Sequence, residues 1–206
     1  MSLILALLFA QDVDPPAPIT ASLVEVKPGA RRYFHDGDRA GCPAAACRRK
    51  GYVVPGDRLI AHETRGGFTR VTYLAPRADT PVEGWIESGG LRPVPPAPLK
   101  AADWLGGWRV WDAEIDIAAG PRSGTLHLGG NATYGARDPE RVKRGAVNTG
   151  GFDADIPMPQ RDRAGVVDSG YEGCRVAMRL LPPYLVVADN GRCGGAGVTF
   201  EGVYRK

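Results

Sequence analysis

Short apolar runs separated by glycine and proline recur along the whole chain. The clearest run lies at 174–181, where Cys174, Val176, Met178 and Leu180 alternate with Arg175, Ala177 and Arg179. A period of two is typical of a half-buried antiparallel strand. The 28 glycines and 18 prolines are scattered between such runs, which favours many short strands joined by turns over long helices. We therefore predict an all-β protein.

A proline-rich stretch divides this pattern into two parts. Residues 93–103 read PVPPAPLKAAD, and proline cannot donate a ladder hydrogen bond. We interpret 93–102 as a stiff, extended linker that does not pair into a sheet. The linker separates a first module at 19–92 from a second module at 103–206, and a Pro-rich leader at 11–18 precedes both.

The first module contains the runs ITASLVEV, KGYVVPGDRLIAHET, FTRVTYL and VEGWIES, which predict short strands and a turn at Pro55-Gly56-Asp57. We expect a small barrel core filled by Val54, Leu59, Ile60, Val71, Tyr73 and Trp85. The order YVVPGDRL, RGGFTRVTY, EGWIESGGL resembles bacterial SH3-like domains of envelope proteins over about residues 20–95. The resemblance implies an SH3-like barrel that contacts cell-wall peptides or other proteins. The insertion at 36–50, DGDRAGCPAAACRRK, departs from the usual pattern and predicts a disulfide-pinned loop.

The second module opens with DWLGGWRVWDAEIDI. Its start at Gly107-Trp108 is similar to lipocalin-type and other small up-and-down barrels, in which the tryptophan plugs one end. Further strands are predicted at 124–135, 174–181, in YLVVA and in the closing VTFEGVYRK, whereas 136–170 is polar, with weaker strands at most. We expect a small antiparallel barrel or sandwich. The two modules together look like exported proteobacterial proteins, some of which are labelled lysozyme-inhibitor-like.

The N-terminal run and the cysteines both indicate export. MSLILALLFA (1–10) followed by a polar, Pro-rich segment predicts a secretory signal cleaved near Ala10, with a buried strand as the alternative. No later segment is long enough to predict a transmembrane helix. Four cysteines allow three pairings, and proximity favours Cys42–Cys47 and Cys174–Cys193. Zinc is the alternative, but the spacing fits no common finger and no histidine lies near a cysteine pair. A periplasmic or secreted location is expected, with neither metal nor cofactor.

Candidate catalytic residues are sparse. His35, His62 and His127 each fit an ordinary structural position, and His127 is expected to face solvent between Leu126 and Leu128. The serines before glycine make neither G-x-S-x-G nor S-x-x-K. On one strand, Asp112, Glu114 and Asp116 would share a face that could bind a cation or serve glycoside hydrolysis. A solvated face opposite Trp111, Ala113, Ile115 and Ile117 explains the same pattern, and we favour it.

Charge is unevenly distributed. Residues 19–95 hold 12 Lys and Arg against 8 Asp and Glu, whereas residues 101–206 hold 13 of each. A surplus of four is too small to predict nucleic-acid binding, and Gly194-Gly195-Ala196-Gly197 precedes a strand rather than the helix that a dinucleotide site needs. A candidate binding surface for an acidic polymer is formed by Arg31, Arg32, Tyr33, Arg48, Arg49, Lys50 and Trp85.

These features predict a non-enzymatic envelope protein that binds a protein or a peptidoglycan component. The alternatives are an inhibitor of a wall-degrading enzyme such as lysozyme, a small-ligand carrier, and a carboxylate-dependent hydrolase that uses the acidic row.

Overall fold

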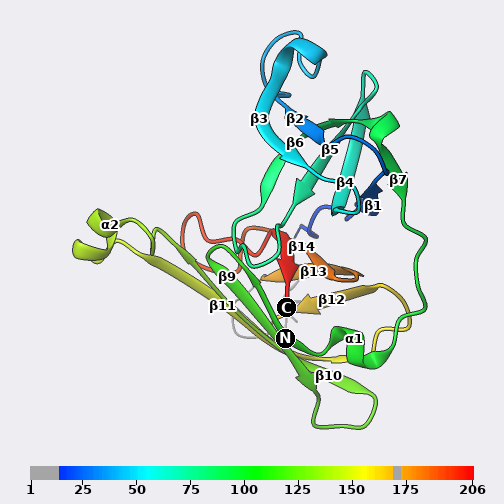
Figure 1. Cartoon of the computed structure of the whole chain (residues 1–206). Coiled ribbons are helices and arrows are strands. Elements are labelled where there is room, and N and C mark those ends of the chain that lie inside the picture. The colour runs from blue at the N-terminus through cyan, green and yellow to red at the C-terminus, as the bar shows by residue number, and fades with distance from the viewer. Residues whose placement is uncertain (1–13, 169–172) are drawn as a thin grey trace, which may run out of the picture.

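The chain folds into two antiparallel β-sheets, which confirms the predicted all-β class (Figure 1). The structure is a computed structural model that describes residues 14–168 and 173–206. The predicted signal at 1–10 lies outside the described residues. In the described parts of the chain, no helix has the length and apolar character needed to cross a membrane.

The first sheet has seven strands in the order β3-β2-β6-β5-β4-β1-β7. Their bounds are β1 Ser22–Val26, β2 Arg32–His35, β3 Arg48–Val53, β4 Arg58–Arg65, β5 Phe68–Tyr73, β6 Val82–Glu87 and β7 Leu91–Pro93, with a 3-10 turn at Ser88–Gly90 between the last two. Leu59 and Val71 lie in the core of the first sheet and Trp85 is buried, as predicted, whereas Ile60 is buried against the second sheet instead. The expectation for Val54 is wrong, because it follows β3 at the turn and is 45% exposed.

The insertion at 36–50 begins as a loop closed by the Cys42–Cys47 disulfide, with a 3-10 turn at Ala45–Cys47, and its last three residues belong to β3. Arg65 from β4 donates from Nη2 to the Gly37 carbonyl at 2.8 Å and to the Cys42 carbonyl at 3.3 Å. The same guanidinium lies 4.6 Å from the Trp85 ring centroid. The loop is therefore fastened to the sheet by Arg65 as well as closed by its disulfide.

The proline-rich segment pairs with the first sheet at its beginning, which corrects the expectation that it stays unpaired. Pro93 lies opposite Val24 in the β1–β7 ladder, and the Val94 amide donates to the Leu23 carbonyl at 3.0 Å. Pairing is possible because β7 is an edge strand, where proline needs no donor on its outer side. The chain then leads to a short helix, α1, at Ala101–Trp104.

The second sheet has eight strands in the order β11-β10-β9-β8-β15-β14-β13-β12. Their bounds are β8 Gly106–Val110, β9 Ala113–Ala119, β10 Thr125–Tyr134, β11 Asn148–Pro157, β12 Arg163–Val167, β13 Arg175–Leu181, β14 Tyr184–Asp189 and β15 Gly202–Arg205. The sheet curls into a nearly closed barrel, and its two ends approach where the Asp153 amide of β11 donates to Asp168 Oδ1 at 3.1 Å, just after β12. Trp108 is buried in the core, and its Nε1 donates to the Trp104 carbonyl at 2.9 Å.

Two long strands, β10 and β11, continue beyond the barrel as an arm (Figure 1). A short helix at the end of the arm, α2 (Pro139–Lys143), begins at Asp138, whose carboxylate accepts from the Glu140 and Arg141 amides. The sequence predicted only weaker strands here, whereas β11 is ten residues long and pairs with β10 along its full length.

The chain ends in a closing segment held by a disulfide and by close backbone contact. Cys174 and Cys193 form the disulfide that proximity favoured. Gly194 forms an isolated bridge with Gly150 of β11, where an added Cβ on Gly150 would lie 2.2 Å from the Cys193 carbonyl oxygen. Phe200 and Tyr204 are buried, as predicted. The closing segment is therefore a packed part of the barrel.

The two sheets share an apolar interface. Ile19, Ile60 and Leu74 from the first half pack with Tyr184, Val186 and Val203 from the second half. Polar contacts cross the same boundary: Tyr184 donates from its hydroxyl to the Arg58 carbonyl at 2.9 Å, and Arg163 donates to the Ile19 carbonyl at 3.0 Å. The linker thus joins two halves that are already packed against each other.

Candidate functional site

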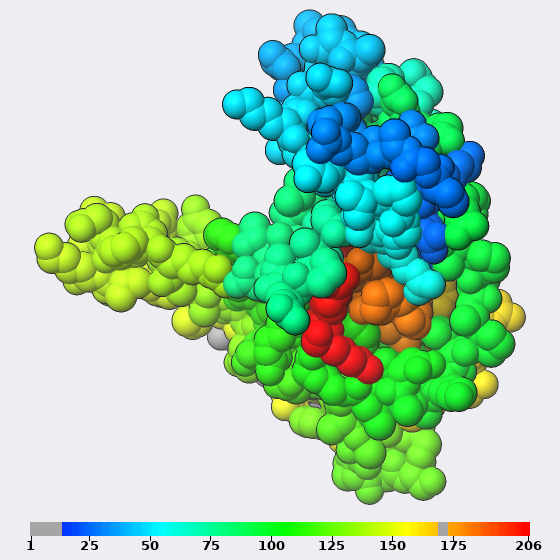
Figure 2. Space-filling model, in the orientation of Figure 1, coloured from blue at the N-terminus to red at the C-terminus, as the bar shows by residue number. Residues whose placement is uncertain are grey.

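A groove of about 880 Å³ lies between the two halves of the protein. One side is formed by β4, β5 and β6 of the first sheet, and the other by the β8–β9 turn, the start of the arm and the β14–β15 region. The space-filling view shows the molecule hollowed between the projecting arm and the first sheet (Figure 2). Ligand sites occur preferentially at such boundaries, and this volume is within their usual range of about 300–1,000 Å³.

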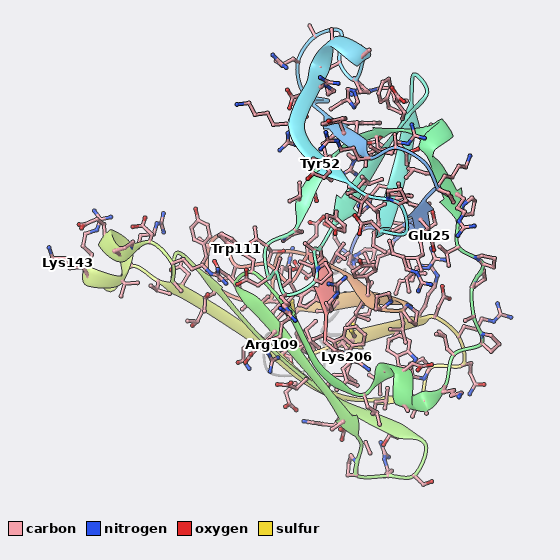
Figure 3. All side chains as sticks on the ribbon, viewed as in Figure 1. Glu25, Tyr52, Arg109, Trp111, Lys143 and Lys206 are labelled. Atoms are coloured by element: carbon pink, nitrogen blue, oxygen red, sulfur yellow. A yellow bond between two sulfur atoms is a disulfide. The ribbon has the colours of Figure 1, made fainter. Side chains whose placement is uncertain are left out.

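Trp111 forms part of the groove wall at the turn between β8 and β9 (Figure 3). Its φ of 29° is in the left-handed region, and its amide donates to the Asp79 carbonyl at 2.7 Å. The sequence placed Trp111 on a buried face with Ile115 and Ile117, but the side chain is 48% exposed. The positive φ ends the alternation at this residue, because it turns the chain between the two strands.

Arg137, from the arm, holds the Trp111 turn against the first sheet. Its guanidinium donates to Asp79 Oδ2 at 2.7 Å, to Asp112 Oδ1 at 2.8 Å and to the Trp111 carbonyl at 2.6 Å. The hydrogen bond from Arg137 lowers the pKa of Asp79, and its bond to Asp79 in turn raises the pKa of Arg137. The contacts join the arm, the turn and the first sheet at one edge of the groove.

Tyr134 is the second half-exposed aromatic residue in the groove and lies at the end of β10. Its side chain is 43% exposed, and the Arg141 guanidinium lies 4.7 Å from the ring centroid. Gly197 lies directly against the ring, because an added Cβ there would be 2.8 Å from Tyr134 Cδ1. The glycine-rich segment before β15 therefore gives Tyr134 room to lie along the groove.

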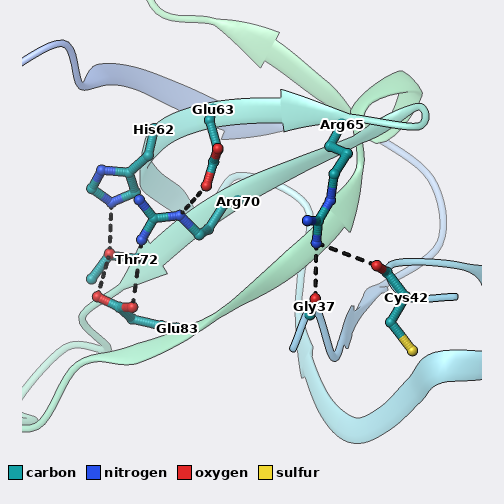
Figure 4. Close-up of polar contacts among 8 residues, drawn as sticks. All are labelled: Gly37, Cys42, His62, Glu63, Arg65, Arg70, Thr72 and Glu83. Atoms are coloured by element: carbon teal, nitrogen blue, oxygen red, sulfur yellow. Dashed lines mark hydrogen bonds and ion pairs between the residues drawn. The ribbon is translucent and has the colours of Figure 1, made fainter. Parts of the chain in front are cut away.

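The opposite wall carries a polar network centred on His62 and Arg70 (Figure 4). His62 Nε2 is 2.8 Å from Thr72 Oγ1, and that hydroxyl is 3.3 Å from Glu83 Oε1. Arg70 pairs with Glu63 at 2.9 Å and with Glu83 at 3.8 Å. Burial, followed by the positive charge of Arg70, lowers the pKa of His62, so the neutral imidazole is favoured. This wall presents both hydrogen-bond donors and acceptors to the groove.

The acidic row does not form a set of facing carboxylates. Asp112 lies in the turn before β9 and pairs with Arg137, whereas Glu114 and Asp116 pair with Arg109 at 3.3 and 3.5 Å. The strand therefore places only the last two acids on the expected common face. His127 is outward-facing as expected, 3.0 Å from Asp155 and 3.4 Å from Asp153.

The predicted basic surface is only partly brought together. Arg31, Arg32, Tyr33 and Arg48 line a small cavity of about 220 Å³ at the β2–β3 side of the first sheet, together with His35. The other three residues lie outside it: Trp85 is buried under Arg65, Arg49 donates to the Glu83 carbonyl at 2.8 Å, and Lys50 is exposed on β3.

Sequence reasoning missed the groove. Two of its lining residues, His62 and Asp112, were considered as candidate catalytic residues, but Trp111 was placed on a buried face. Within the described residues, no group of three or more His, Cys, Asp or Glu side chains is arranged to hold a metal ion. Comparisons with models of protein families, with curated proteins and with solved structures found no significant match.

Proposed function

We propose that the protein is a non-enzymatic binding protein of the cell envelope that holds a peptidoglycan component in the groove between its sheets. The observation that carries this proposal is the groove itself, with half-exposed Trp111 and Tyr134 beside a wall of mixed donors and acceptors. Aromatic residues are amphipathic, rigid contact surfaces, and they are enriched where proteins bind partners.

The chemistry of a peptidoglycan fragment matches the groove. Sugar rings present apolar C–H faces that pack on aromatic side chains, and stem peptides carry carboxylates together with amide groups and amines. The groove offers cations at Arg70 and Arg141 and carboxylates at Glu83 and Glu201. A ligand of mixed charge is therefore favoured over a uniformly acidic polymer.

The disulfides support the compartment that this function needs. Both Cys42–Cys47 and Cys174–Cys193 are formed, which fits an extracellular or other oxidising compartment. A signal at 1–10, a periplasmic or secreted location and the SH3-like resemblance belong to the proposal. In that resemblance, the first sheet is the type of domain that contacts wall peptides or envelope proteins.

The test is retention of the purified protein on isolated cell wall, in parallel with capture from an envelope extract. We expect the protein to sediment with cell wall. Trp111→Ala or Tyr134→Ala should reduce its affinity for cell wall about tenfold or more, as for aromatic anchors at an interface. Val167→Ala is the matched control, since Val167 is 64% exposed and does not line the groove. Failure of the protein to be retained on cell wall would contradict the proposal. Capture of an envelope protein without retention on cell wall would show that the partner is a protein and not a peptidoglycan component.

A second function, inhibition of a wall-degrading enzyme, is favoured by the arm. The arm projects from the barrel (Figures 1 and 2), and its end carries Arg141, Lys143 and Arg144 against Asp138 and Glu140, a surplus of one positive charge, together with Val142, which is 52% exposed. Glycoside hydrolases use a pair of carboxyl groups at the cleaved bond, so a projecting tip whose last residues, Lys143 and Arg144, are cationic is suited to such a cleft.

A lysozyme turbidity assay tests the inhibitor function. Excess protein should slow clearing of the cell suspension, and the double variant Val142→Asp, Lys143→Glu should lose that effect. The groove variant Trp111→Ala is the control and should still inhibit. Clearing at an unchanged rate with excess wild-type protein would end this second proposal.

A further inference from the structure

The small cavity at the β2–β3 side of the first sheet has the composition of an anion site. Its lining includes Arg31, Arg32 and Arg48, against one carboxylate, Glu87. Among the ion pairs of the described residues, none involves these three guanidinium groups. The cavity thus carries a net positive charge that the protein itself does not neutralise.

Aromatic stacking orients two of the three guanidinium groups. Arg48 lies 4.6 Å from the Tyr33 ring centroid, and Arg31 lies 4.8 Å from the centroid of Tyr52 and 5.3 Å from that of Tyr33. Tyr33 and Tyr52 are opposite each other in the β2–β3 ladder and pack edge to face (Tyr52 is labelled in Figure 3). Because stacked guanidinium groups lose less freedom when they bind, the arginines are partly arranged before a ligand arrives.

A buried histidine provides an independent indication of a ligand. His35 lines the same cavity and is only 4% exposed, yet its Nδ1 has no hydrogen-bond partner within the described residues. The Nε atom of Arg32 is also buried without a partner there. Buried polar atoms without partners are costly and rare in folded proteins, so a rotation of either side chain toward a ligand in the cavity would relieve that cost.

We propose that this cavity binds a phosphate group. Its volume of about 220 Å³ is smaller than a typical small-molecule pocket and suits one charged group of a ligand. Three arginines against one glutamate leave two positive charges, which match the −1.5 to −2 of a phosphomonoester better than the single charge of a carboxylate. Guanidinium groups bind phosphate oxygens in bidentate geometry, so the three arginines supply the contacts that a phosphate group needs.

This site is separate from the proposed groove, so the two can be tested independently. No residue that lines the cavity also lines the groove. The probe is inorganic phosphate, titrated into the full chain in 150 mM NaCl while the imidazole resonances are followed by NMR. The His35 signals should shift saturably, and those of His127 should stay in place.

Charge variants on exposed side chains make the test specific. Arg48→Gln and Arg31→Gln should each weaken phosphate binding by about tenfold, whereas Glu87→Gln should strengthen it several-fold, because it removes the opposing charge. Lys50→Gln is the matched control, since it removes a cation from the same strand outside the cavity, and it should change the affinity less than twofold. If Lys50→Gln lost as much phosphate affinity as the arginine variants, binding would be explained by general charge attraction and the site would be overturned.

Two further arms define the ligand and its source. Acetate should bind more weakly than phosphate, and equal or tighter acetate binding would overturn the assignment to phosphate. Phosphatidylcholine vesicles with and without phosphatidic acid separate a lipid headgroup from a free phosphate compound. Binding to the acidic vesicles without any response to inorganic phosphate would overturn the cavity as the site and leave a surface interaction in its place.

Discussion

The guanidinium of Arg137 lies 4.3 Å from the centroid of the Trp111 ring, although the two residues belong to different turns of the second sheet. The same guanidinium reaches Asp79 of the first half. One side chain therefore sets the position of an aromatic wall and its distance from the opposite sheet. Several consequences can be measured.

Removing this stacking should weaken ligand binding while leaving the fold intact. Arg137→Ala frees the Trp111 ring and the Asp79 contact, and we expect the affinity for cell-wall fragments to fall about tenfold, as for a typical interface hot spot. The circular dichroism spectrum should stay unchanged, because Arg137 and Trp111 are both about half exposed. Arg122→Ala, in the exposed β9–β10 connection, is the control. Equal affinity in both variants would show that the stacking is irrelevant to binding.

Stability should decrease in mild acid because of His62. Its pKa in the folded protein lies below the ordinary value of 6.5, chiefly through burial. As the pH falls below about 6.5, the unfolded chain takes up a proton at His62 before the folded protein does, so the free energy of unfolding falls until the pH passes the folded pKa. Urea titrations between pH 7.5 and 5 measure this slope. His62→Gln should make the slope shallower, and parallel curves for both proteins would contradict the prediction.

The two disulfides should contribute unequally to stability. Cys174–Cys193 closes a sequence separation of 19 in the barrel core, and its loss through a double alanine substitution should cost about 3 kcal/mol. Cys42–Cys47 closes a separation of only 5 in a surface loop, so the corresponding double variant should lose less. Unfolding of both variants in guanidinium chloride measures the two losses in the free energy of unfolding. Equal losses would show that loop length does not determine the contribution of each disulfide.

Close backbone contact at Gly150 should make that position intolerant of any side chain. An added Cβ would lie 2.2 Å from the Cys193 carbonyl oxygen and 2.7 Å from Gly194 Cα, and backbone atoms cannot move aside cheaply. Gly150→Ala should therefore destabilise the protein by about 2–3 kcal/mol, as overpacked sites do. Gly129→Ala on neighbouring β10 is the matched control, because its nearest atom is 4.0 Å away, and its melting temperature should change little. A Gly150→Ala variant with unchanged stability would contradict this close contact.

Local patterns predicted much of the fold. Alternation at 174–181 correctly placed Val176, Met178 and Leu180 inside, and proximity correctly paired the cysteines. The β11 strand was missed because its buried residues, Phe152 and Ile156, are separated by aspartates and alanine, which have low strand propensity. Its pairing with β10 stabilises it instead, and long-range pairing leaves no local signal.

The candidate site was largely beyond sequence reasoning for the same physical reason. The groove depends on Asp79, Trp111 and Arg137, which come together only when the two sheets pack. The basic residues could be recognised in the sequence as short charge clusters. The β2–β3 ladder, however, determines which of them lie together at the small cavity. His35 was interpreted as ordinary, because neither its burial nor the lack of a partner for Nδ1 among the described residues can be read from its sequence neighbours.

The packed boundary around Ile60, Leu74, Tyr184 and Val186 has a consequence for how the two halves evolve. A gene segment that encoded only one half would produce a protein with an uncovered apolar face, prone to aggregate. We therefore expect separation of the halves at the proline-rich segment to be unfavourable. We expect the two halves to be transmitted together as a single evolutionary unit.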